Sequence, residues 1–207
     1  MEVLGRKFFI LMFCISIGSA LAAQNHQVLV DAFSMSYAKE TAGDYKGGVD
    51  ALKAVYNKNS YELNLRLGWL SYLAGMLDES ISYYQRAITL MPMGIEARLG
   101  LVYPVSSMGN MTQVINTYND ILKIDPMNTL ANFRLGLVYY GRNDFVKAKP
   151  LFKKVVDLYP FDYDGIHMLG WTNLKLGNTH DAKILFEKAL LYKPGDASAK
   201  EGLSLIK

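Results

Sequence analysis

The sequence contains a single cysteine among its 207 residues, and this scarcity excludes several kinds of protein. Cys14 lies in an apolar N-terminal stretch, so the rest of the chain has no disulfide, no thiol chemistry and no thiolate metal site. Charge of one sign is lacking too: 22 Lys and Arg residues stand against 19 Asp and Glu, without a run of either. A net charge of +3 is too small to predict nucleic-acid binding.

Catalytic motifs are absent as well. The sequence has no phosphate-binding glycine loop, no HExxH and no Gly-x-Ser-x-Gly. Its histidines, His26, His167 and His180, lack the spacing of metal ligands. We therefore predict a non-catalytic protein without metal or cofactor. An enzyme stays open as a third hypothesis, which requires that the fold bring His167, Asp164 and a further acid together in a pocket.

The first 23 residues have the layout of a signal peptide. Arg6 and Lys7 precede an apolar run over residues 8–17, and small residues follow, with cleavage candidates after Ala22 and Ala23. The run is shorter than the ~18 residues that a comfortable membrane span needs. We predict export to the periplasm or the exterior; the alternative is an uncleaved segment that anchors the chain in a membrane. Phe13, which precedes the cysteine, is too large for a lipoprotein signal, so no lipid anchor is expected.

Prolines are few but regularly spaced. Four of the six stand 34 residues apart and divide the chain into units 61–94, 95–128, 129–162 and 163–196; they are Pro92, Pro126, Pro160 and Pro194. Other positions align in the same register. Position 8 is Gly in three units and Val102 in the other, position 15 is Gly or Asn and position 24 is aromatic, as in Gly136, Asn143 and Phe152.

This repeat predicts stacked helical hairpins. The first half of a unit has apolar residues at helical spacing, and the second half repeats them at i, i+4 and i+7, as in Ala148, Phe152 and Val155. A small residue at position 8 lets two helices approach closely, and Gly or Asn at position 15 can adopt the left-handed conformation that ends a helix. Proline stops the second helix before the next unit. Such units bury their apolar faces only by stacking.

The residues Leu-Gly, Gly/Asn, Ala, Tyr/Phe, Ala and Pro at these positions resemble the tetratricopeptide repeat family. Examples are Leu169, Gly170, Gly177, Ala182, Phe186, Ala189 and Pro194. The resemblance implies an all-α fold, a right-handed α-solenoid of about five helix-turn-helix repeats. Residues 29–60 fit a degenerate first repeat, and residues 197–207 are expected to form a C-terminal capping helix.

Two further prolines interrupt this pattern. Pro104 falls inside the first helix of unit 95–128 and is expected to remove a hydrogen bond and kink that helix, which either is tolerated drift or reshapes the binding surface. Pro150 is expected near the start of a second helix, where its cost is lower.

In the family, the first helices of successive units line the inner face, and positions 5, 9 and 12 point into it. This row is mostly aromatic here, and its predicted partner-binding residues are Trp69, Tyr72, Tyr103, Phe133, Tyr140, His167 and Trp171. The Lys and Asn residues with which some relatives hold a carboxylate terminus are absent from the row. An aromatic row suits an apolar or helical segment of a partner. Alternatively, the N-terminal segment, the C-terminal helix or tight coiling covers it.

We therefore predict an exported scaffold that binds a peptide or helical segment of a partner protein through an aromatic-lined concave groove. The second hypothesis is a structural subunit of a cell-envelope complex, in which the same face is permanently buried.

Overall fold

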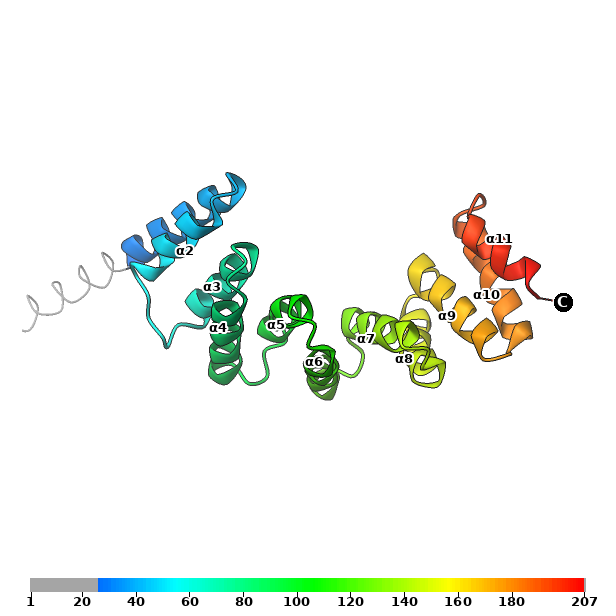
Figure 1. Ribbon diagram of the computed structural model, residues 1–207. Coiled ribbons are helices and arrows are strands. Elements are labelled where there is room, and N and C mark those ends of the chain that lie inside the picture. The colour runs from blue at the N-terminus through cyan, green and yellow to red at the C-terminus, as the bar shows by residue number, and fades with distance from the viewer. Residues whose placement is uncertain (1–25, 207) are drawn as a thin grey trace, which may run out of the picture. The chain divides into compact units, whose positions relative to one another are not determined.

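A computed structural model describes residues 26–206, and every regular element among them is an α-helix (Figure 1). A helix over residues 26–41 comes first. The helices that follow are α2 (Tyr45–Lys53), α3 (Tyr61–Leu73), α4 (Leu77–Leu90), α5 (Glu96–Ser107), α6 (Met111–Ile124), α7 (Thr129–Gly141), α8 (Phe145–Leu158), α9 (Tyr163–Lys175), α10 (Thr179–Tyr192) and α11 (Ala197–Ser204). The predicted signal peptide lies outside the described residues. Within residues 26–206, no helix combines the length and apolar character that crossing a membrane requires.

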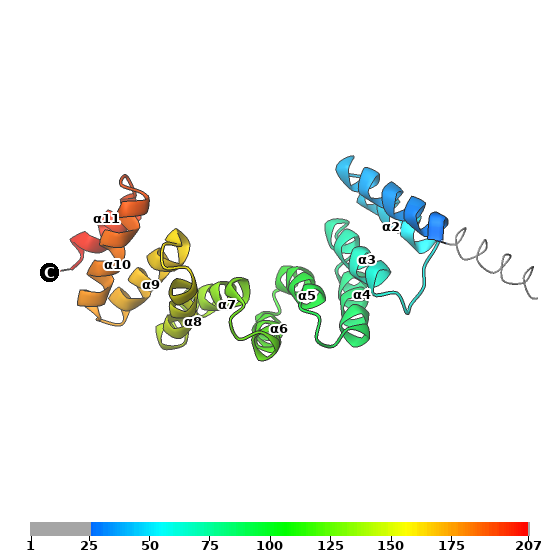
Figure 2. The ribbon, with the colours of Figure 1, turned by 180° about the vertical axis from the view of Figure 1, so that it is seen from behind.

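Each predicted unit contains two helices joined by a tight turn. Helices α3 and α4 fall in unit 61–94, and α9 and α10 fall in unit 163–196. Both views show these partners lying side by side (Figures 1 and 2). The degenerate unit 29–60 covers α2 and most of the 26–41 helix, which begins three residues before the unit, and α11 lies in the predicted capping segment 197–207.

The chain divides into two compact units, and the boundary along the sequence falls within α5, between Pro104 and Val105. Pro104 does not end this helix, which continues to Ser107. Pro150 is the sixth residue of α8, beyond the first turn, so the expectation that it stands near the start was wrong. Its missing N–H removes a hydrogen bond to the Val146 carbonyl, because the first four N–H groups of a helix are unpaired anyway but the sixth is not.

The turn between the two helices of a repeat depends on one residue with positive φ. At position 15, φ is 75° at Gly43, 76° at Gly75, 72° at Gly109, 59° at Asn143 and 78° at Gly177. This left-handed conformation ends the first helix, as the sequence predicted. The second helix then begins within two residues, and in α8 the Asp144 carboxylate accepts a hydrogen bond from the backbone N–H of Lys147.

In the N-terminal unit, a buried ring joins successive repeats. The core contains Val49, Leu52, Leu63, Leu67 and Leu70. The Tyr84 ring of α4 packs against Gly68, where an added Cβ would lie 3.0 Å from it, and against Gly100 of α5, where an added Cβ would overlap it. Burial raises the pKa of Tyr84 well above its usual value.

The C-terminal unit repeats this arrangement with phenylalanine. The Phe152 ring packs on Gly136, whose added Cβ would lie 2.7 Å away, and Phe186 packs on Gly170 and on Gly202 of α11. Both rings are fully buried. The sequence analysis predicted that the small residue at position 8 lets two helices approach closely. The structure adds that the aromatic ring at position 24 packs on this residue.

Candidate functional site

First helices of successive repeats form a groove of about 570 Å³ in the N-terminal unit. The 26–41 helix contributes Phe33 and Tyr37, and α3 contributes Tyr61 and Trp69. Helix α5 contributes Glu96, and the buried Tyr84 closes the floor. The volume falls in the range of sites that hold a small molecule or a few side chains.

Three of the predicted partner-binding residues come together beside this groove. The rings of Trp69 and Tyr72, both on α3, have centroids 5.7 Å apart, and Tyr103 of α5 lies 5.7 Å from Trp69 and 5.5 Å from Tyr72. Tyr103 is 50% exposed, whereas Trp69 and Tyr72 are half-buried. Rings at such distances and angles attract one another, so the cluster presents a preformed apolar surface.

A partly buried polar network, which the sequence analysis missed, fixes the position of Trp69. Its indole Nε1 donates to Glu40 Oε1 at 2.7 Å, and Glu40 also pairs with Arg66 at 2.6 Å. Arg66 Nε donates to Ser36 Oγ at 3.1 Å, and the Tyr37 ring covers the guanidinium, 3.9 Å from Cζ to the ring centroid. The only signal in the sequence was an arginine within the apolar stretch of residues 63–70.

The hydrogen bonds of this network keep the Glu40 carboxyl group ionised. Burial alone would raise the pKa of Glu40, but the hydrogen bonds from Trp69 and Arg66 and the charge of Arg66 together bring this pKa below its usual value. Glu40 therefore stays ionised at neutral pH. The network orders the side chains of the groove and leaves the indole ring available to a ligand.

Two predicted residues in the C-terminal unit pack against neighbouring rings. Phe133 of α7 meets Phe152 edge-on, with centroids 5.8 Å apart, and Tyr140 meets Phe145 at 5.2 Å. Burial raises the pKa of Tyr140. Both predicted residues are half-buried, so each has part of its surface in packing and part open.

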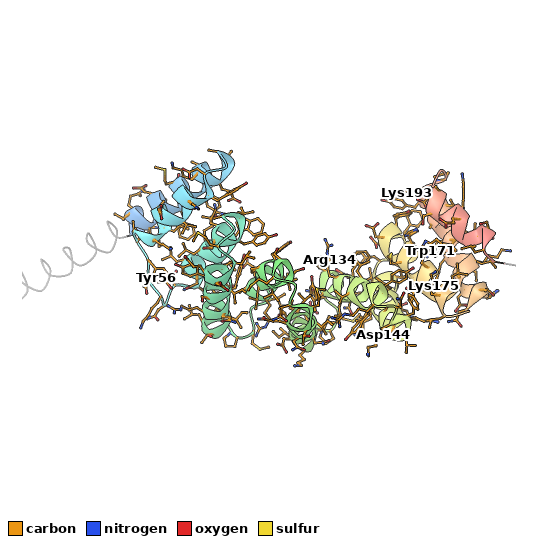
Figure 3. The ribbon with its side chains drawn as sticks, in the orientation of Figure 1. Tyr56, Arg134, Asp144, Trp171, Lys175 and Lys193 are labelled. Carbon is orange, nitrogen blue, oxygen red and sulfur yellow. The ribbon has the colours of Figure 1, made fainter. Side chains whose placement is uncertain are left out.

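His167 and Trp171, the last two predicted residues, contact the C-terminal helix α11; Trp171 is labelled in Figure 3. Trp171 Nε1 lies 3.0 Å from Ser198 Oγ of α11 and 3.2 Å from His167 Nε2, and His167 Nε2 lies 2.9 Å from Ser198 Oγ. The Trp171 ring also packs on Phe186, with centroids 5.3 Å apart. Helix α11 thus covers this part of the aromatic row. Cover by the C-terminal helix was one of the alternatives raised from the sequence.

The side chains of the groove suit non-covalent binding of a ligand. It offers ring faces, an apolar floor and carboxylates. The described residues contain no group of three or more His, Cys, Asp and Glu side chains arranged to hold a metal ion. Between residues 26 and 206, the hydrogen bond of His167 with Ser198 joins α9 to α11.

Stacked helical hairpins with a ring-and-glycine contact between repeats define the α-solenoid class, so the predicted fold class is confirmed. Profiles of the tetratricopeptide repeat family match residues 61–92, 130–162 and 163–196. The chain is a tetratricopeptide repeat protein. Proteins built of these repeats are interaction scaffolds and are generally non-catalytic, so protein partners are expected of this chain.

Solved structures of the same class are similar in fold. A tetratricopeptide repeat protein from Parabacteroides merdae has a TM-score of 0.73 and 22% identity, over 86% of this chain and 72% of that one. MamA from Desulfovibrio magneticus has a TM-score of 0.67 and 20% identity, over 82% of this chain and 98% of that one. At these identities the likeness concerns the fold alone.

One curated relative is similar in sequence. The uncharacterized protein ycf37 of Cyanophora paradoxa is 32% identical over 92 residues, which make up 42% of this chain and 54% of the relative. The match therefore spans about half of the relative's length.

Proposed function

We propose that this chain is an exported scaffold that binds a peptide or helical segment of a partner protein in the groove of its N-terminal unit. The observation that carries the proposal is the cluster of Trp69, Tyr72 and Tyr103 at the edge of the groove, held in place through Glu40 and Arg66. Trp and Tyr supply much of the binding energy at protein interfaces, and a fixed ring loses little entropy on binding.

The other predicted residues have different places in this proposal. Phe133 and Tyr140 keep part of their surface open and remain candidate contacts of the C-terminal unit. His167 and Trp171 act through α11, since their polar atoms are engaged with Ser198. Export rests on the sequence of the first 23 residues, and fractionation of the native host with an antibody to the chain would test it.

Site-specific photocrosslinking in the native host tests the binding site. A photoreactive amino acid replaces Tyr103 at the rim of the groove, or Val146, a 72% exposed residue of α8, as the matched control. We expect a discrete crosslinked protein from position 103 that is absent at position 146. Trp69→Ala in the same chain, shown to be folded by circular dichroism, should reduce the product at least several-fold.

Two outcomes contradict the proposal. Equal crosslinking from both positions would show that the groove is not the contact. A product from position 103 that survives Trp69→Ala, formed with a protein that stays bound to the chain through purification without crosslinking, would instead support the permanently buried subunit of a larger complex.

A further inference from the structure

The groove of the N-terminal unit contains acidic side chains that lack a cationic partner. Glu62 and Glu96 line it and are exposed, and neither forms an ion pair within the part of the chain that the structure describes. Arg66 also lines the groove, but its charge is matched by Glu40. Three carboxylates and one guanidinium leave this site with a net charge of −2. A basic ligand is therefore favoured.

The C-terminal unit contains an occupied version of the same arrangement. Tyr163 stands at position 1 of unit 163–196; burial and the nearby Asp196 carboxylate together raise the pKa of its hydroxyl. Lys193 Nζ lies 3.5 Å from the centroid of the Tyr163 ring. A tyrosine ring, a carboxylate and an ammonium group thus meet within one chain, an arrangement in which the ring face and the carboxylate both attract the cation.

The N-terminal unit has the corresponding tyrosine without the lysine, and its carboxylate comes from a residue two positions further along the repeat than Asp196. Tyr61 stands at position 1 of unit 61–94, and its hydroxyl lies 3.5 Å from Glu96 Oε2. The position that Lys193 holds in its own repeat is taken here by Met91, an exposed and uncharged side chain. Glu62 follows Tyr61 directly in the chain and adds a second carboxylate.

We infer that a lysine or arginine side chain of the bound partner segment occupies this place, with its cation against the Tyr61 ring and beside Glu62 and Glu96. The inference rests on the proposed function, because it specifies the segment that the groove binds. Apolar side chains of the same segment pack on Phe33 and Trp69.

A second feature of the groove also favours a ligand with hydrogen-bond acceptors. The Arg66 side chain is only 10% exposed, and its Nη2 has no hydrogen-bond partner among the described residues. An unpaired buried donor is costly, so a backbone carbonyl oxygen of the bound segment would stabilise it once the Arg66 side chain turns towards the groove. A peptide segment with both basic and apolar side chains matches these features.

Selection from a library of random 12-residue peptides, displayed on phage and offered to the full chain, tests this inference. Recovered peptides are counted only if Trp69→Ala abolishes their binding, which ties them to the groove. We expect them to be enriched in Lys or Arg beside Leu or aromatic residues. The strongest binder is then synthesised with a fluorescent label, together with an analogue in which Gln replaces each basic residue.

Three variants test whether the charge of the groove, and not only its shape, determines peptide binding. Fluorescence anisotropy measures the affinity of each variant for the labelled peptide. Glu62→Gln/Glu96→Gln removes both carboxylates, and Met91→Lys supplies a cation from within the chain, as Lys193 does for Tyr163. Asp50→Asn/Asp78→Asn removes the same charge from exposed positions outside the groove lining and serves as the control. We expect the first two to weaken binding by about tenfold at low salt and the control to change it by less than about twofold.

The outcomes distinguish the inference from the function on which it rests. If peptides require Trp69 but show no basic preference, or if Met91→Lys binds as the wild type does, the inference is wrong and the proposed function stands. If no recovered peptide requires Trp69, both fail. If the chain instead self-associates in light scattering and Met91→Lys dissociates it, the occupant is a second copy, which overturns the inferred partner.

Discussion

The residue at position 15 of each repeat has a left-handed backbone conformation, so the effect of a substitution there depends on that residue alone. Gly177 has φ of 78°, and an added Cβ there would meet nothing within 4 Å. Gly177→Ala should therefore lower the free energy of unfolding through the backbone alone, by about 1–2 kcal/mol. Urea denaturation followed by circular dichroism measures the change.

Gly141→Ala is the matched control, because Gly141 is the last residue of α7, also with open space around its Cβ position but without positive φ. It should leave the unfolding midpoint unchanged or raise it slightly. Equal effects of the two substitutions would show that backbone conformation is not the cause.

Gly202 illustrates the opposite cause, steric contact. A Cβ at this position would overlap the fully buried ring of Phe186. Gly202→Ala should cost about 1–3 kcal/mol, since a packed aromatic ring has no room to move. The loss should be larger than for Gly177→Ala and should appear first as earlier unfolding of α11, monitored by the fluorescence of Trp171. A midpoint equal to that of the wild type would contradict the ring contact.

At the scale of an element, the docking of α11 makes stability depend on pH. Burial lowers the pKa of His167 below its usual value near 6.5, while Asp196 and Asp164 oppose the shift and Lys193 adds to it. The unfolded chain thus takes up a proton at a higher pH than the folded chain does. Stability from this group is present above about pH 6.5 and is lost as the pH falls through the lower folded value.

Urea midpoints between pH 5 and pH 8 measure this dependence. The wild type should become less stable towards pH 5, and His167→Gln, which retains a side chain able to reach Ser198, should show a flatter profile over the same range. A slope that is unchanged in the variant would assign the pH dependence to other groups.

Helix α8 also affects the stability of the chain, because Pro150 removes a backbone hydrogen bond in its interior. Pro150 is exposed, so its ring is not required for packing. Pro150→Ala should raise the free energy of unfolding by about 1–3 kcal/mol through the restored bond to the Val146 carbonyl. Thermal denaturation would show a higher midpoint, and an unchanged one would mean that the helix has adapted to the proline.

At the scale of the whole molecule, the sequence predicted those features that depend on contacts repeated from unit to unit. In three of the four proline-bounded units, a glycine at position 8 touches the ring at position 24, so Gly136 and Phe152 could be found by alignment alone. The turns at Gly75 and Asn143 were predictable for a similar reason: few residues tolerate positive φ.

The candidate site was less predictable because its environment differs between repeats. Trp69 and Trp171 both stand at position 9, yet one lies beside Glu40 at an open groove and the other is bonded to Ser198 of α11. The periodicity gives the direction of a side chain but not what lies opposite. Arg66 was missed because its partner Ser36 comes from another repeat, 30 residues away in sequence.

The contact of Gly202 with Phe186 has a consequence for engineering. Helix α11 is seated as a first helix of a repeat is, with Gly202 and Ala199 at the positions that Gly100 and Ala97 hold in α5. A copy of residues 163–196 inserted after residue 196 would therefore offer α11 an unchanged seat. In the inserted copy, the residue equivalent to Met168 would pack on a phenylalanine of the preceding repeat, as Met168 itself packs beside Phe152. The chain can therefore be lengthened by inserting whole 34-residue repeats.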